Sequence, residues 1–282
     1  MKKHKIEETV FKFLMLASMV VVLGSLFLIL GTVIGRGLPA LNLAMLTQTP
    51  KGGYYLGKEG GILNAILGSL YLAGGATLLA LLVSLPIAIY LQIYAVRSKF
   101  VELIRLSLDI LWGIPSIVYG AFGFTLMLFL GMRASLFGGM VTLALLELPI
   151  MTRGMDEAIA MVPAALKESS YALGATRYET AMKVIVRQTV PGLLTAVLLA
   201  FGRGIGDAAS VLFTAGYTDR LPTSLFGPAA SLPLAVFFQL GTPFPAVQER
   251  AYASALVLTI IVLTLSLISR RLAGRWRDQI VR

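Results

Sequence analysis

Long apolar stretches alternate with shorter polar ones along the whole chain. Six stretches are apolar enough to cross a hydrocarbon layer about 30 Å thick, which takes roughly 20 helical residues each. They cover residues 13–35, 62–94, 104–131, 134–152, 189–213 and 252–270. We therefore predict an all-α, polytopic membrane protein with six transmembrane helices.

The composition supports this prediction, since 57% of the residues are hydrophobic and only 13% are charged. The first apolar stretch follows Lys2, Lys3 and Lys5 and so has the charge pattern of a signal peptide. It is longer than the core of a cleaved signal, however, and no clear small-x-small cleavage site ends it. We expect a retained anchor helix.

Several kinds of chemistry are excluded by the residues that the chain lacks. It has no cysteine and a single histidine, His4, in the N-terminal tail. Disulfides, thiolate metal sites and cysteine nucleophiles are thereby ruled out, and a histidine base or histidine-ligated zinc inside the fold is not expected. We predict no catalytic residues, no metal site and no cofactor bound by this chain.

One motif imitates a phosphate-binding loop. Gly52, Gly57 and Lys58 match the Gly-x4-Gly-Lys spacing. Glu59 stands where Ser or Thr should bind magnesium, and no strand precedes the motif. If ATP drives this protein, we expect the ATPase to be another polypeptide.

The net charge of +10 follows the predicted topology. Lys and Arg are concentrated in the N-terminal tail, in residues 97–105, in residues 153–187 and after residue 269. The segments 36–61 and 214–251, on the other side, hold few. By the positive-inside rule both termini are cytoplasmic. The basic excess therefore indicates a lipid membrane, not nucleic acid.

The segment 153–188 differs from the other polar segments, because it mixes charges with apolar residues at helical spacing. A short helix over 164–173, a sharp turn at Gly174 and a second helix over 177–186 would form a compact knob. We call residues 164–186 the knob. An amphipathic helix lying on the membrane surface is the alternative.

The sequence of the knob resembles the EAA loop of the permease subunits of type I ABC importers. The matching residues are Glu168-Ser169-Ser170-Tyr171-Ala172-Leu173-Gly174-Ala175-Thr176, then Val184-Ile185-Val186, then Pro191-Gly192. The resemblance implies that the knob docks on a separate ATPase. The residues that it assigns to this coupling are Glu168, Ser169, Ala172, Gly174, Ala175 and Thr176.

Two further segments narrow the resemblance to the phosphate permeases, and among them to the PstA-type subunit. They are Trp112-Gly113-Ile114-Pro115-Ser116-Ile117-Val118-Tyr119-Gly120 and Pro222-Thr223-Ser224-Leu225. The similarity covers about residues 60–272. The chain departs from the family's pattern at three places. Val186-Arg187-Gln188 stands where Val-Leu-Pro is usual, Asp207 where Glu is typical, and Glu147 where the family tends to be apolar.

The resemblance implies a permease fold and a set of partners. The partners are a homologous (PstC-like) permease subunit, a dimer of (PstB-like) ATP-binding subunits that carry ATP and magnesium, and an extracytoplasmic (PstS-like) phosphate-binding protein. We divide the chain into an anchor helix with the first outer loop (1–61), a permease domain (62–272) with its coupling loop (153–188), and a basic tail (273–282).

Arg203 and Asp207 are the charged residues of the fifth predicted span. They lie four residues apart, so we expect them to share a helix face and to be able to pair. Charges are costly in hydrocarbon, and both should face a wet cavity or the protein interior. We assign them to the substrate pathway, with a purely structural ion pair as the alternative.

Two other acids, Asp109 and Glu147, are expected near cytoplasmic helix ends, paired with Arg105 or Arg153. Two rival functions stay open at this point. The first is an ABC permease for another oxyanion or small solute. The second, from a different class, is an ion-coupled carrier that uses Asp109, Glu147 and Asp207.

Overall fold

The computed structural model describes residues 2–51, 59–95 and 99–276. The first half comprises α1 (Lys2–Gly37), α2 (Leu43–Thr47), β1 (Pro50–Lys51), β2 (Glu59–Gly60), α3 (Leu63–Ile89), the π-helical η1 (Tyr90–Tyr94), α4 (Lys99–Gly113) and α5 (Ser116–Phe129). The second half comprises α6 (Leu136–Ala160), α7 (Ala164–Ala172), α8 (Arg177–Glu179), the π-helical η2 (Thr180–Ile185), α9 (Val186–Ile205), α10 (Leu232–Leu240) and α11 (Pro245–Trp276).

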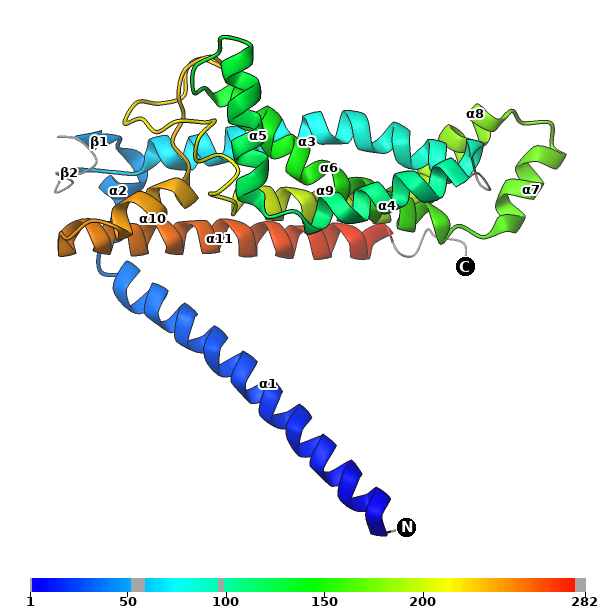
Figure 1. Cartoon of the computed structure of the whole chain (residues 1–282), viewed down its shortest axis with the longest axis horizontal. Coiled ribbons are helices and arrows are strands. Elements are labelled where there is room, and N and C mark those ends of the chain that lie inside the picture. The colour runs from blue at the N-terminus through cyan, green and yellow to red at the C-terminus, as the bar shows by residue number, and fades with distance from the viewer. Residues whose placement is uncertain (1, 52–58, 96–98, 277–282) are drawn as a thin grey trace.

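A bundle of α3, α6, α9 and α11 runs along the long axis of the molecule (Figure 1). The knob stands at one end of it, and α2 and α10 lie at the other, which we call the far end. Alanines of α3 and larger apolar residues of α6, such as Leu143 and Met151, are fully buried between the helices. The prediction of an all-helical bundle is confirmed, apart from the two-residue strands, which pair antiparallel.

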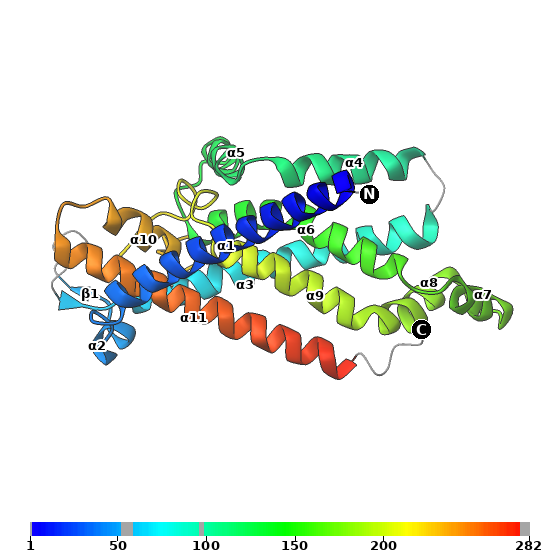
Figure 2. The same ribbon diagram turned by 90° about the horizontal axis from the view of Figure 1, so that it is seen from below.

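Five helices of the described part are long and apolar enough to span a membrane, or six if α4 and α5 count as one. These two helices form the third predicted span, but they meet at an angle of 100°. Pro115 lies at the break and has an extended conformation, with φ −57° and ψ 137°. As a result α5 projects sideways from the bundle, while α4 lies along it (Figure 2).

The fifth span, predicted over 189–213, lies nearer the N-terminus, since its helical run covers Arg177–Ile205. Helix α9 ends at Ile205, and the chain then follows an irregular path up to α10. This path is not simply an outer loop, because Ala215, Ala229 and Ala230 are fully buried. Its backbone groups are satisfied across the fold: Ser135 N donates to Thr214 O at 2.8 Å. Irregular backbone is tolerated at membrane depth where protein surrounds it in this way.

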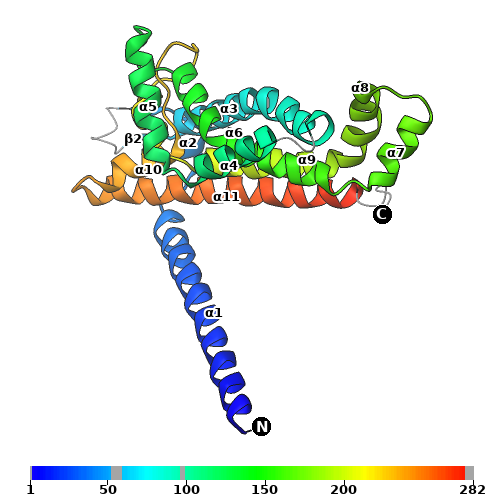
Figure 3. The ribbon, with the colours of Figure 1, turned by 45° about the vertical axis from the view of Figure 1, so that its right-hand side comes forward.

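Helix α1 stands clear of the bundle along most of its length (Figure 3). It touches α11 at its C-terminal end, where Gly37 packs so closely that a Cβ would lie 2.6 Å from Tyr252 O. Arg36 lies over the Tyr252 ring, 5.3 Å from its centroid. The long apolar surface of α1 is therefore anchored to the rest of the chain at one end only.

The knob has the predicted form of two short helices separated by a turn. Gly174 adopts φ +81° in the turn, a conformation that residues with a Cβ rarely adopt. The second helix does not stop at the membrane: α8, η2 and α9 form one continuous helical run from Arg177 to Ile205. The second half of the knob and α9 of the bundle are thus parts of one helix.

Candidate functional site: the knob, the ionic network and the Arg203 region

The knob presents an exposed tip. Leu173, next to the turn, is 88% exposed. Such exposure is unusual for a large apolar residue, because burial in the core of the bundle would be more favourable. Glu168, Ser169, Ala172, Gly174 and Thr176 are also exposed, and Ala175 is half-buried. The sequence analysis assigned these six residues to coupling but did not include Leu173.

Inside the knob, short polar contacts fix the two helices. Ser170 and Thr180 share a buried hydrogen bond of 2.9 Å. Thr176 caps the second helix: Glu179 N donates to its Oγ1 at 3.2 Å, and Thr176 N donates to Glu179 Oε2 at 3.1 Å. Thr176 therefore has a structural role, besides being exposed. Partial burial lowers the pKa of Lys167 on α7.

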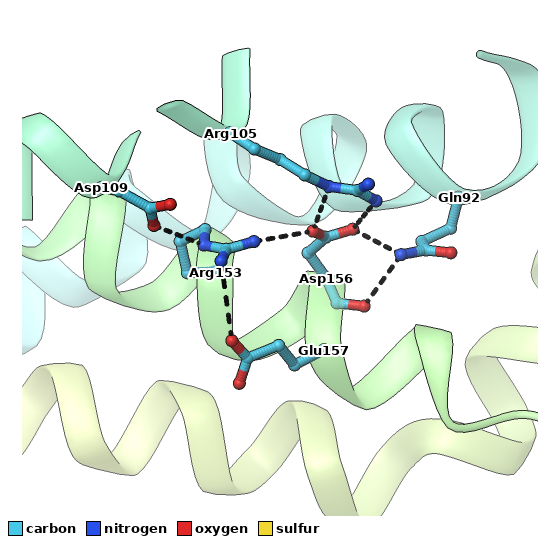
Figure 4. A network of polar contacts seen from close by, with 6 residues as sticks. All are labelled: Gln92, Arg105, Asp109, Arg153, Asp156 and Glu157. Atoms are coloured by element: carbon cyan, nitrogen blue, oxygen red, sulfur yellow. Dashed lines mark hydrogen bonds and ion pairs between the residues drawn. The ribbon is translucent and has the colours of Figure 1, made fainter. Parts of the chain in front are cut away.

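A network of charged residues ties η1, α4 and α6 together near the knob end (Figure 4). Asp156 is at its centre, with a side chain only 3% exposed. Its carboxylate accepts hydrogen bonds from Gln92 Nε2 at 2.7 Å and from Arg105 Nε at 2.8 Å and Nη2 at 3.0 Å. Arg153 bridges this carboxylate to α4, with Nη1 3.3 Å from Asp156 and Nε 2.7 Å from Asp109.

The network confirms one prediction and adds a residue that the sequence analysis missed. Asp109 pairs with Arg153, as expected. Asp156 was not singled out, although the spacing Arg-x-x-Asp places it on the same helix face as Arg153. Within the described residues, the only ion pairs between α4 and α6 belong to this network. We therefore expect the network to hold α4 in place.

Replacing Asp156 by Ala should destabilise the protein by at least about 2 kcal/mol, because hydrogen bonds to charged groups contribute roughly 1.5–3 kcal/mol each. The measurement is the midpoint of heat-induced aggregation of the detergent-solubilised protein. Glu157→Gln is the matched control, since Glu157 is 70% exposed and 3.8 Å from Arg153. An unchanged midpoint for Asp156→Ala would show that the network carries little stability.

Glu147 lies in the middle of the bundle, and its predicted position is wrong. It was expected at a cytoplasmic helix end, but α6 runs on to Ala160 and so places residue 147 near its centre. The side chain is fully buried. Thr77 Oγ1 of α3 donates to Oε2 at 2.7 Å, while Oε1 has no hydrogen-bond partner among the described residues. Oε1 faces the backbone of Gly204 on α9, where a Cβ would overlap it.

The predicted pairing of Arg203 with Asp207 is also wrong. No ion pair joins them in the described structure, because α9 ends between them. Asp207 is 9% exposed, and its Oδ2 instead accepts a hydrogen bond of 2.8 Å from Ser210 N in the turn that follows the helix. Arg203 is exposed on the last turn of α9. Since the neighbouring Gly204 contacts Glu147, Arg203 lies level with the middle of the bundle.

The phosphate-loop-like motif and the possible metal ligands are the remaining candidates. The Gly52-to-Lys58 motif lies outside the described residues, apart from its neighbour Glu59. Within residues 2–51, 59–95 and 99–276, no group of three His, Cys, Asp or Glu side chains could hold a metal ion. The polar groups of interest are therefore those of the knob, the network and the Arg203 region.

Comparison with protein families identifies residues 84–278 as similar to the binding-protein-dependent transport system inner membrane component. Among curated proteins, the chain is 35% identical over 243 residues to the phosphate transport system permease protein PstA of Haemophilus influenzae, covering 86% of this chain and 85% of that one. It is 34% identical over 268 residues to PstA 1 of Mycobacterium tuberculosis strain H37Rv, covering 94% and 87%.

Solved structures share the fold at lower identity. The inward-facing MetNI methionine ABC transporter matches with a TM-score of 0.64 and 18% identity, over 76% of this chain and 95% of that one. A bacterial ABC transporter for import of the acidic polysaccharide alginate matches with a TM-score of 0.56 and 16% identity, over 97% and 99%. The chain therefore has the fold of ABC importer permeases.

Proposed function

Since this chain belongs to the family of binding-protein-dependent transport system inner membrane components, as one of its phosphate permeases, we propose that it forms part of the path of an ATP-driven phosphate importer and couples through its knob to a separate ATPase. The observation that carries this proposal is the identity of 34–35% over most of the chain, combined with an intact knob. The chain itself is a permease and not an ATPase.

The proposed partners follow from this assignment. A homologous permease subunit would complete the path, two ATP-binding subunits would hold ATP and magnesium, and an extracytoplasmic binding protein would deliver phosphate. Six coupling residues (Glu168, Ser169, Ala172, Gly174, Ala175 and Thr176) lie on or beside the exposed tip of the knob, where an ATPase could reach them. A rigid docking element of this kind transmits motion because it belongs to the same helical run as α9.

The orientation is part of the proposal. The positive-inside rule places both termini and the knob in the cytoplasm and the far end outside. A reporter enzyme fused after Trp276 or inserted in the knob turn should be active only in the cytoplasm, and one inserted after Lys51 only outside. A cytoplasmic signal from the Lys51 fusion would contradict the six-span arrangement.

For the pathway we propose Arg203. It is exposed in the single chain at the middle level of the bundle, and a guanidinium there should face water or another subunit and not lipid. Its planar fork of donors suits the oxygens of phosphate. Asp207 is buried beside it and shapes the turn after α9 through Ser210, so we propose a supporting role for Asp207.

The ion-coupled carrier is the weaker alternative. Of the three acids that it would use, Asp109 pairs with Arg153, and Asp207 is engaged by Ser210 N. Such a carrier would also have no use for an exposed knob. A permease for another oxyanion differs only in the groups that contact the cargo.

The experiment that tests the function is uptake of radiolabelled phosphate by proteoliposomes that contain the purified complex, with ATP inside the vesicles or outside. Because import ends on the knob side, we expect uptake only when ATP is inside the vesicles and the binding protein is outside, and sulfate in excess should compete weakly. ATP-independent uptake driven by an ion gradient would support the carrier instead. Strong competition by sulfate would support the other oxyanion.

A further inference from the structure

A carboxyl group fully buried between three helices, with one hydrogen-bond donor, needs an explanation. Glu147 has no cationic neighbour among its described contacts and receives its hydrogen bond from Thr77 alone. Burying such a group is unfavourable, and an apolar residue of similar size would usually stabilise the site more. Two other acids near the bundle are engaged elsewhere: Asp156 in the ionic network and Asp207 with Ser210.

The packing of α6 against α9 shows what the carboxyl group adds. The two helices run antiparallel and approach closely at three levels. At one level a Cβ on Gly192 would lie 2.6 Å from Ala158 Cβ, and at the next a Cβ on Gly154 would lie 2.9 Å from Ala196 Cβ. Small apolar contacts of this kind let helices approach closely, but they distinguish poorly between one register and another.

The third level of the same interface is the contact between Glu147 and Gly204. Here a long polar side chain of α6 is held by a hydrogen bond from α3 and fills the space left by the missing side chain of α9. A slide or rotation of α9 would bring a neighbouring side chain against the carboxyl group. Among the three contacts, this one fixes the register of α9.

We propose that Thr77, Glu147 and Gly204 form a lock that sets the position of α9 and thereby holds Arg203 in place for the substrate. This inference rests on the proposed function, which places Arg203 in the substrate pathway. Arg203 directly precedes Gly204, so the position of α9 at Gly204 also sets the position of Arg203. At its other end α9 continues into the knob. The lock therefore lies where a displacement transmitted from the knob reaches the pathway, and Glu147 is a positioning residue that does not itself contact phosphate.

The lock predicts a specific pattern of suppression between two variants. Gly204→Ala places a methyl group where Glu147 Oε1 lies. It should raise the half-saturating phosphate concentration for uptake about tenfold or more, since overpacking at a tight site displaces the helix. Glu147→Ala added to Gly204→Ala makes room for that methyl group and should bring the concentration back to within about threefold of wild type.

Two controls separate the lock from general damage. Gly202→Ala introduces the same methyl group two residues away, where nothing lies within 4 Å, and should leave uptake within about twofold of wild type. Glu147→Gln keeps the shape and the acceptor for Thr77, so it should also transport normally. A large loss with Gln would show that the charge of Glu147 is used, and would overturn the lock.

The measurements distinguish failure of the lock from failure of the proposed function. A merely structural role would reduce the number of active complexes, hence the maximal rate, and leave the half-saturating concentration unchanged. The same suppression should appear in the heat stability of the purified complex, which requires no substrate. If the double variant is as impaired as Gly204→Ala in both measurements, the inference about the lock is wrong. Absence of phosphate uptake by the wild type would refute the proposed function alone.

Discussion

Leu173→Asp is expected to leave the permease folded and inserted but to reduce phosphate uptake to about a tenth or less. The side chain is 88% exposed at the tip of the knob. Burying a leucine in a partner's groove contributes roughly 1.5–3 kcal/mol, and each 1.4 kcal/mol is about tenfold in binding. A carboxylate in its place would lose this contribution and add a cost of desolvation.

The measurement is co-purification of the ATP-binding subunit with tagged permease, together with uptake normalised to permease abundance. Leu173→Met is the matched control, because it keeps an apolar side chain of similar volume, and we expect it to be near wild type. If Leu173→Asp retains the ATPase and transports normally, the tip of the knob does not make the contact that we propose.

The knob could be predicted from the sequence because its determinants are local. Gly174 supplies the one backbone conformation that the turn needs, and the spacing of Thr176 and Glu179 is that of a capping box. Each signal lies within a few residues of the feature that it produces. The exposure of Leu173 is different in kind, since it depends on the rest of the fold: no segment of the described residues covers the tip.

The end of α9 could not be predicted because the deciding contacts join distant parts of the chain. Residues 202–213 are rich in glycine and mostly apolar apart from Arg203 and Asp207, so hydropathy alone extends the span through them. In the structure the helix ends at Ile205. Further along, Thr214 O accepts a hydrogen bond from the backbone N of Ser135, the residue just before α6. The expected pairing of Arg203 with Asp207 was wrong for the same reason, because the four-residue rule applies only while the helix continues.

The position of Glu147 shows a further limit of the sequence. Its charge suggested a helix end, where an arginine would be near. In the structure the helix extends past it, and the group that meets it is a bare glycine backbone on another helix. Hydropathy scores a residue by its own character and not by the space that a distant glycine leaves open. Such pairs become visible only when the helices are packed.

Arg203→Gln is expected to abolish most phosphate uptake while the complex still assembles. Two arginine hydrogen bonds to phosphate are charge-assisted, and each contributes roughly 1.5–3 kcal/mol, so their loss should reduce uptake at low phosphate by at least about tenfold. Since Arg203 and Asp207 form no ion pair here, exchanging the two charges should not restore transport. Asp207→Asn keeps an oxygen that can accept the hydrogen bond of Ser210 N, and we expect it to be less impaired.

Arg187→Gln is the control for Arg203→Gln, because it makes the same change on an exposed residue of the same helix, at the knob end. We expect it to transport within about twofold of wild type. The measurement is initial uptake of radiolabelled phosphate, normalised to the amount of assembled complex. Loss of the partner permease from Arg203→Gln complexes would assign the arginine to a subunit interface, and normal uptake by this variant would remove it from the pathway. A guanidinium that contacts the substrate predicts intact complexes that do not transport.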